Sequence, residues 1–204
     1  MGKREKILET AKKIFAEKSF FEATLEDISF LSGVKKSTIY YYFGSKLELL
    51  LEIVNVILEQ AIESIATIPF SLSSQEILER IIDGYFAFFY QERDSILIFR
   101  RIAYDFFTHP EVFQELRQSW QRFRKVRENL GKRIGVLETK GGSKIDGPEI
   151  IRIVISSINA YWIEEIAEGR EIKLEDKEVF KDIFTAFIKV KENNDGKTKE
   201  LVNS

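Results

Sequence analysis

The sequence predicts an all-α protein of about nine helices. Apolar residues recur every three or four positions along almost the whole chain of 204 residues, a spacing that places them on one side of a helix. Only three prolines occur, and residues typical of helix starts and stops bracket the periodic segments. No stretch alternates apolar and polar residues as a half-buried strand does, so strands are not expected.

The segment that follows an amphipathic first helix predicts two short helices joined by a tight turn. Thr24 with Asp27 three residues later is a capping pattern that satisfies the free backbone N–H groups of a helix start. Leu25, Ile28 and Leu31 recur at helical spacing. Gly33 ends this helix, because glycine tolerates the left-handed conformation just past a helix end.

The next helix is expected over residues 36–42 and closes at Gly44, and Ser45 with Glu48 then forms a second capping box. Two short helices around a glycine-containing turn are a helix-turn-helix, whose second helix enters the major groove of DNA. Lysine, serine and threonine reach base edges or phosphates, and tyrosine hydroxyls suit phosphates. The polar outer face of this helix comprises Lys35, Lys36, Ser37, Thr38 and Tyr41, and the inner face comprises Val34, Ile39, Tyr40 and Phe43.

The run GVKKSTIYYYFGSKLELL resembles the recognition segment of tetracycline-repressor-type (TetR family) transcriptional regulators. Nine residues fit the family pattern: Thr24, Ile28, Gly33, Val34, Thr38, Tyr40, Phe43, Lys46 and Leu49. Small departures are Ser29, Tyr42 and Leu47. The motif covers about the first quarter of the chain, and the remainder agrees only in length and helical character.

The resemblance implies roles for single residues of the recognition helix. Lys36, Ser37 and Thr38 would contact bases, whereas Tyr41, Tyr42 and Lys46 would contact phosphates. Tyr40 could serve either as core or as a phosphate contact. Lys35 completes the predicted DNA-binding set. Residues 1–47 are then the DNA-binding domain and residues 48–204 an effector-binding and dimerisation domain.

Six further helices are expected beyond the motif. Helical spacing and breakers place the fourth at 46–66, the fifth at 74–91 and the sixth at 94–107. Thr108 and Glu111, around Pro110, are expected to cap the seventh, which extends to about Ile134. A glycine-rich loop follows, and Pro148 suits the first turn of the eighth, ending near 168. The ninth covers about 174–191.

The eighth helix, IIRIVISSINAYWIEEIA, is apolar on nearly all sides, so it must be buried on two faces. It is either a central core helix of a monomer or part of a subunit interface. The resemblance favours a homodimer, because in such regulators the last two long helices of each subunit form a four-helix bundle. Asp at Ile155 or Ile158 would then dissociate or unfold the protein.

Aromatic residues concentrate in the fifth to ninth helices, and most are expected to be core. The resemblance places an effector pocket there, suited to a hydrophobic small molecule. Its expected walls are Phe89, Phe99, Phe106, Trp120, Phe123 and Trp162. Polar candidates for orienting the ligand are Asn159, Tyr104, Arg100, Arg101 and Arg152.

Several functional classes are disfavoured. The chain has no cysteine and one histidine, His109, which argues against a transition-metal site, and no cofactor is implied. It lacks a Ser/His/Asp set and a phosphate-cradling glycine loop, so an enzyme is not expected. The first 50 residues hold nine Lys/Arg against seven Asp/Glu, which gives the proposed DNA end the basic balance.

Without a membrane span or signal peptide, a cytoplasmic protein is expected. The preferred function is a ligand-responsive regulator, most simply a repressor released from a palindromic operator. The alternative is a helical protein–protein adaptor that retains a helix-turn-helix. An adaptor would lack salt-dependent, sequence-preferring affinity for DNA.

Overall fold

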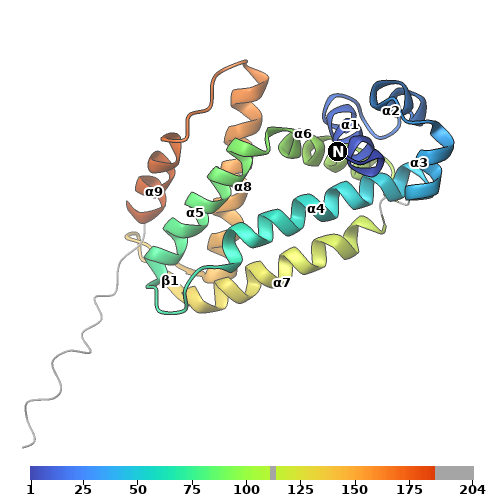
Figure 1. Cartoon of the computed structure of the whole chain (residues 1–204). Helices are drawn as coiled ribbons and strands as arrows, with labels where there is room; N and C mark the ends of the chain where they lie inside the picture. The colour runs from blue at the N-terminus through green and yellow to red at the C-terminus, as the bar shows by residue number, and fades with distance from the viewer. Residues whose placement is uncertain (111–113, 187–204) are drawn as a thin grey trace, which may run out of the picture.

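The computed structural model describes residues 1–110 and 114–186, without the side chains of Phe106 and Phe107. Within these residues nine helices and one short hairpin are present, which confirms the all-α prediction (Figure 1). The elements are α1 (Lys3–Glu17), α2 (Leu25–Ser32), α3 (Lys36–Phe43), α4 (Lys46–Ala66), α5 (Ser74–Gln91), α6 (Arg93–Thr108), α7 (Leu116–Ile134), β1 (Val136–Glu138), β2 (Lys144–Asp146), α8 (Gly147–Ala167) and α9 (Asp176–Ala186).

The helix-turn-helix forms from the local signals that predicted it. Thr24 Oγ1 accepts a hydrogen bond from Asp27 N–H at 3.1 Å, and Asp27 Oδ2 accepts from Thr24 N–H at 3.2 Å. Gly33 and Gly44 end α2 and α3 with φ near +67° and +68°, a region that favours glycine. The second predicted box is half formed, because Ser45 Oγ accepts from Glu48 N–H without a returned hydrogen bond.

One apolar position of this motif was misjudged. Leu25 and Ile28 are buried as their spacing predicted, but Leu31 is 65% exposed. α2 is only eight residues long, and its contacts with α1 and α3 bury Leu25 and Ile28 alone. The neighbouring Phe30 is also exposed, at 86%.

Two long helices link the DNA-binding end to the rest of the molecule. α4 and α7 run side by side, α5 and α8 pack on them, and α6 packs on α1, α5 and α8 (Figure 1). α4 and α5 have the predicted bounds, since polar caps and Pro69 isolate them. α7 and α8 come close together at Gly131 and Gly147, where a Cβ on Gly147 would lie 1.9 Å from Gly131 O.

The loop predicted after α7 is in fact a small antiparallel hairpin, which corrects the expectation of no strands. Val136 pairs with Asp146 and Glu138 with Lys144. Three-residue strands are too short to show alternation, so the sequence contains no detectable strand pattern here. The start of α7 was also misplaced, because Thr108 ends α6 and α7 begins at Leu116; Glu111 lies outside the described residues.

α8 is two-sided, but differently from the prediction. Ile155 and Ile158 are 5% and 0% exposed within a single subunit, so they belong to its own core. Its outward side carries Ile153 and Ala160 instead. Phe187 and Ile188, predicted for the end of the last helix, lie outside the described residues.

Among the described residues, no helix is long and apolar enough to cross a bilayer. The same part of the chain holds no cluster of three or more side chains able to bind a metal ion.

Candidate nucleic-acid interface and effector pocket

The predicted base-reading residues lie together on α3 and its N-terminal flank. Lys35 and Ser37 are exposed, and Lys36 and Thr38 are half-buried. Ile39 and Phe43 hold the opposite side of α3 in the core. A short helix fixed on one side and polar on the other can present its side chains to a groove.

The three tyrosines also lie at the surface. Tyr41 is 83% exposed and contacts Tyr42 edge-on, with ring centroids 5.3 Å apart. Tyr40 is 48% exposed, so its expected place on the inner face is wrong. Its hydroxyl-bearing ring is therefore available at the surface, and a phosphate contact stays a prediction.

Lys36 is held in position by an acidic residue of the preceding helix. Its Nζ forms an ion pair with Glu26 of α2 and lies 5.8 Å from the Tyr40 ring centroid. The hydrogen bond that Lys36 donates to Glu26 raises the pKa of Lys36. DNA would have to displace Glu26 before Lys36 could contact a base or phosphate.

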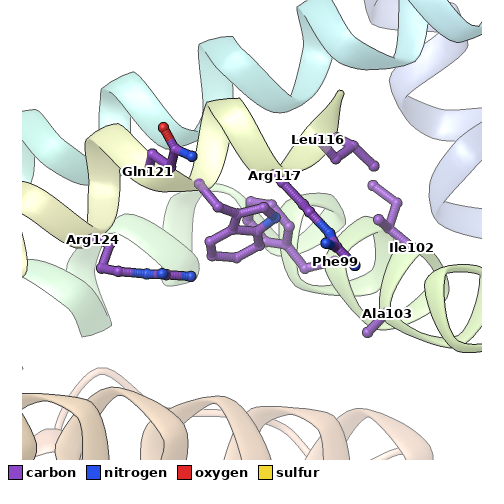
Figure 2. Close-up of a pocket in the computed structure, with 8 residues that line it drawn as sticks. Phe99, Ile102, Ala103, Leu116, Arg117, Gln121 and Arg124 are labelled. Atoms are coloured by element: carbon purple, nitrogen blue, oxygen red, sulfur yellow. The ribbon is translucent and has the colours of Figure 1, made fainter. Parts of the chain in front are cut away.

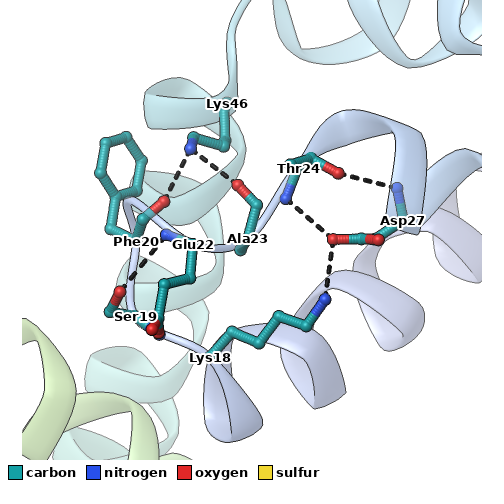
Figure 3. A network of polar contacts seen from close by, with 8 residues as sticks. All are labelled: Lys18, Ser19, Phe20, Glu22, Ala23, Thr24, Asp27 and Lys46. Atoms are coloured by element: carbon teal, nitrogen blue, oxygen red, sulfur yellow. Dashed lines mark hydrogen bonds and ion pairs between the residues drawn. The ribbon is translucent and has the colours of Figure 1, made fainter.

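Lys46 occupies a different environment from the other candidates. Its Nζ donates to Phe20 O at 2.6 Å and Ala23 O at 2.7 Å, and it lies 4.4 Å from the Phe20 ring centroid (Figure 3). Burial lowers its pKa, an effect that nearby Asp105 opposes. Lys46 thus joins the start of α4 to the α1–α2 loop, and its predicted phosphate contact would compete with these carbonyls.

α6 is fastened to the same loop region by two polar contacts. Asp105, 3% exposed, accepts a hydrogen bond from Phe20 N–H at 2.9 Å. Arg101 Nε donates to Ala16 O at 2.8 Å. These bonds place α6 directly against the DNA-binding helices, so a displacement of α6 would reach them.

The far side of α6 borders a cavity of about 510 Å³ between α6 and α7 (Figure 2). Phe99 and Trp120, two predicted walls, line it with ring centroids 5.3 Å apart. The complete lining is Phe99, Ile102, Ala103, Leu116, Arg117, Trp120, Gln121 and Arg124. The cavity is therefore apolar at its base and cationic at its rim.

Other predicted walls lie away from this cavity. Phe89 and Trp162 are 1% and 2% exposed and pack on each other, with centroids 6.5 Å apart. Phe123 is 4% exposed and contacts Trp120 from behind, with centroids 6.0 Å apart. All three are core residues in this structure. The side chain of Phe106 is outside the described part.

The arginines and the tyrosine that the sequence suggested for orienting a ligand make other contacts in the structure. Arg101 bonds the backbone of α1, and Arg152 forms an ion pair with Glu149. Tyr104 and Arg100 line a separate depression beside His109. The rim residues Arg117, Gln121 and Arg124 were missed, because polar residues on α7 resemble an ordinary solvent-exposed helix face.

A cluster of incompletely bonded polar groups lies where α5, α7 and α8 meet. Arg127 Nε, Asn159 Oδ1 and Trp162 Nε1 are buried without hydrogen-bond partners in the described structure. Tyr85 lies beside Arg127 and Asn159, and burial raises the pKa of its hydroxyl. Buried polar groups are normally paired, so these atoms could still form hydrogen bonds with a further polar group.

The fold and the exposed face of α3 define a helix-turn-helix DNA-binding protein. Residues 7–53 match the family described as "Bacterial regulatory proteins, tetR family". Residues 7–53 therefore carry the DNA-binding helix-turn-helix of this TetR family of transcriptional regulators.

Relatives extend the similarity beyond the motif. The HTH-type transcriptional regulator CymR of Pseudomonas putida is 24% identical over 191 residues, covering 93% of this chain and 89% of CymR. YvdT of Bacillus subtilis, described as an uncharacterized HTH-type transcriptional regulator, is 26% identical over 187 residues, covering 88% and 92%.

Solved structures agree in fold. A TetR-like transcriptional regulator from Rhodococcus matches with a TM-score of 0.66 at 22% identity, covering 89% of this chain and 92% of that one. The fatty acid degradation regulator FadR from Bacillus halodurans matches with a TM-score of 0.69 at 15% identity, covering 90% and 94%. At these identities the likeness concerns the fold.

Proposed function

We propose that the protein is a ligand-responsive transcriptional repressor that binds a palindromic DNA operator as a homodimer. Residues 1–47 bind DNA, and residues 48–204 bind the effector and the second subunit. The observation that carries the proposal is α6, which borders the cavity at Phe99 and bonds the DNA-binding helices through Asp105. Such a regulator acts on the chromosome, which places it in the cytoplasm.

DNA recognition is assigned to α3. Lys36, Ser37 and Thr38 contact bases, and Tyr40, Tyr41 and Tyr42 contact phosphates together with Lys35. Two such helices in a dimer would enter successive major grooves, roughly 34–36 Å apart. Occupancy of a promoter by the dimer would block polymerase without any further activity.

The Lys36–Glu26 pair supplies a sharp test of DNA recognition. Lys36→Ala should weaken binding to an operator selected from a random duplex library, by about 1–3 kcal/mol, and relax its sequence preference. Glu26→Gln should strengthen binding several-fold, because Lys36 no longer has to leave a carboxylate. Fluorescence anisotropy at several salt concentrations measures both effects.

The control for that experiment is Lys177→Gln, a change of charge far from α3 that breaks an ion pair with Asp83. It should leave operator affinity unchanged. Absence of salt-dependent, sequence-preferring DNA binding in the wild-type protein would instead favour the adaptor alternative.

The second subunit is assigned to the outward faces of α8 and α9. Val179 and Ile183 on α9 are 58% and 46% exposed, and Ile153 on α8 is 36% exposed. Apolar side chains gathered on one face indicate an interface. Val179→Glu or Ile183→Glu should give a folded monomer by sedimentation, whereas Ile155→Asp should unfold the chain, because Ile155 lies in the core of its own subunit.

Induction requires the effector to bind the non-DNA conformation more tightly than the DNA-bound one. A ligand between α6 and α7 would move α6 relative to α4, and with it the loop that Asp105 and Lys46 hold. A coupling of about 2 kcal/mol lowers operator affinity roughly thirtyfold, enough to act as a switch.

A further inference from the structure

The cavity between α6 and α7 combines an apolar base with a cationic rim. Phe99, Ile102, Leu116 and Trp120 supply the apolar surface, whereas Arg117, Gln121 and Arg124 are its polar lining residues. No aspartate or glutamate is among the lining residues that the structure describes. A neutral apolar ligand would use the base of this cavity and would leave Arg124 without an ion-pair partner among the described residues.

The positive charge continues past the rim along α7. Arg127 lies one helical turn beyond Arg124, and its guanidinium approaches both Arg124 and Arg152. Arg152 is paired with Glu149. For Arg124 and Arg127, in contrast, the described residues provide no ion-pair partner. Burial, aided by the charges of Arg124 and Arg152, lowers the pKa of Arg127, and Glu128 and Tyr85 oppose this shift only in part.

Uncompensated charge at a partly buried site is unfavourable, and an arginine there is normally paired. A donor beside this charge is also unused, because Arg127 Nε lacks a hydrogen-bond partner within the described structure. An anion near Arg124 and Arg127 would relieve the repulsion between them. Guanidinium groups match carboxylates in geometry and can bond them through two parallel N–H groups.

We propose that the effector is an amphipathic organic carboxylate, with its apolar body on Phe99 and Trp120 and its carboxylate bound by Arg124 and Arg127. This inference rests on the proposed function, since it names the ligand class of the same pocket. The aromatic side chains exclude water from the body of the ligand, and the arginines select its charge. The carboxylate end of the ligand would point toward the meeting point of α5, α7 and α8.

The test uses the full-length protein and six probes that share two apolar bodies. The first set is 2-naphthoate, 2-naphthamide and 2-naphthylmethylammonium, and the second is octanoate, octanamide and octylammonium. Isothermal titration calorimetry should give at least about tenfold tighter binding for one carboxylate than for its amide, as expected of a charge-assisted pair. The matched ammonium should bind weakest.

Substitutions of single arginines test which side chains bind the carboxylate. Arg124→Gln and Arg127→Met should each reduce the carboxylate-over-amide preference to about twofold or less while binding of the amide persists. Arg122→Gln is the matched control on α7, because Arg122 pairs with Glu59 of α4 and does not line the cavity. It should keep the full preference.

The outcomes separate this inference from the proposed function. Equal binding of carboxylate, amide and ammonium, preference surviving in Arg124→Gln, or no binding by any of the six probes at millimolar concentration would overturn the carboxylate assignment. Operator release by a neutral or cationic probe at a lower concentration than by the matched carboxylate would do the same while upholding the regulator. Failure of the probe-free protein to bind any selected duplex would overturn the regulator itself.

Discussion

The DNA-binding helices and the helices around the pocket differ in how completely their polar groups are hydrogen-bonded. In the first 47 residues, caps and loop carbonyls have partners close by: Thr24 with Asp27, and Lys46 with Phe20 and Ala23. The buried polar atoms that the described structure leaves unbonded all lie between residues 83 and 162. Asp83 is compensated by ion pairs with Lys177 and Lys181; the others are on Ser95, Arg127, Asn159 and Trp162.

The difference follows from what each region must do. A recognition helix has to be presented in one geometry, which local capping and carbonyl bonds enforce. A ligand pocket contains hydrogen-bonding groups that only the ligand satisfies. While the pocket is empty, these unpaired groups lower the stability of the folded protein. Deleting a bonded polar group of the first region should therefore be destabilising, whereas deleting an unbonded buried group of the second should be harmless or even stabilising.

The largest expected effect is at the bond that joins the two regions. Asp105→Ala removes the acceptor of the buried Phe20 N–H and the carboxylate that opposes the depressed pKa of Lys46. We expect a loss of about 2–3 kcal/mol in the free energy of unfolding, the scale of a lost bond to a charged group. Urea denaturation followed by circular dichroism measures it.

Asp105→Asn is the control, because an amide oxygen can still accept from Phe20 N–H. It should lose clearly less stability than Asp105→Ala. Equal stability of Asp105→Ala and the wild type would mean that α6 is not fastened to the DNA-binding helices by this bond.

A matched pair of hydroxyl deletions tests the comparison directly. Thr24→Ala removes the cap of α2 and should cost about 1 kcal/mol. Ser95→Ala removes a fully buried hydroxyl that has no hydrogen-bond partner in the described structure, and should stabilise by about 0.5–1 kcal/mol. The same denaturation assay compares the two variants. A destabilised Ser95→Ala would contradict the expected difference between the two regions.

These local rules also explain what the sequence could predict. The bounds of α4 and α5 and the helix-turn-helix follow from caps and breakers within a few residues of each other. The environment of Lys46 could not be predicted, because its partners Phe20 and Ala23 are more than 20 residues away. The placement of Ile155 inside its own subunit likewise depends on long-range packing.

The pocket was predicted only in part for the same reason. Phe99 and Trp120 were expected from the aromatic content and the family resemblance, but equally aromatic Phe89 and Trp162 are core residues. Periodicity tells which side of a helix is apolar, not whether that side meets a cavity. The cationic rim on α7 becomes visible only when α6 is placed opposite it.

The smallest expected effect concerns a polar contact in the pocket-bearing region that is satisfied. Tyr161 OH of α8 donates to Asp176 Oδ2 of α9 at 2.8 Å. Tyr161→Phe removes this bond and should cost about 0.5–1 kcal/mol at pH 8. A paired hydroxyl in this region should therefore be destabilising to remove, like the hydroxyl of Thr24 and unlike that of Ser95.

The same bond predicts a pH dependence. Burial and the Asp176 carboxylate raise the pKa of Tyr161 from its ordinary value of 10 to about 12. The folded protein therefore holds the phenolic proton more tightly than the unfolded chain, so the contribution is complete below pH 10 and is lost as the pH rises toward 12. Urea denaturation of wild type and Tyr161→Phe at pH 8, 10 and 11 should show a difference that shrinks only above pH 10. A difference that stayed constant up to pH 11 would argue that the hydroxyl is not tied to Asp176, and that α9 is held on α8 by apolar contacts alone.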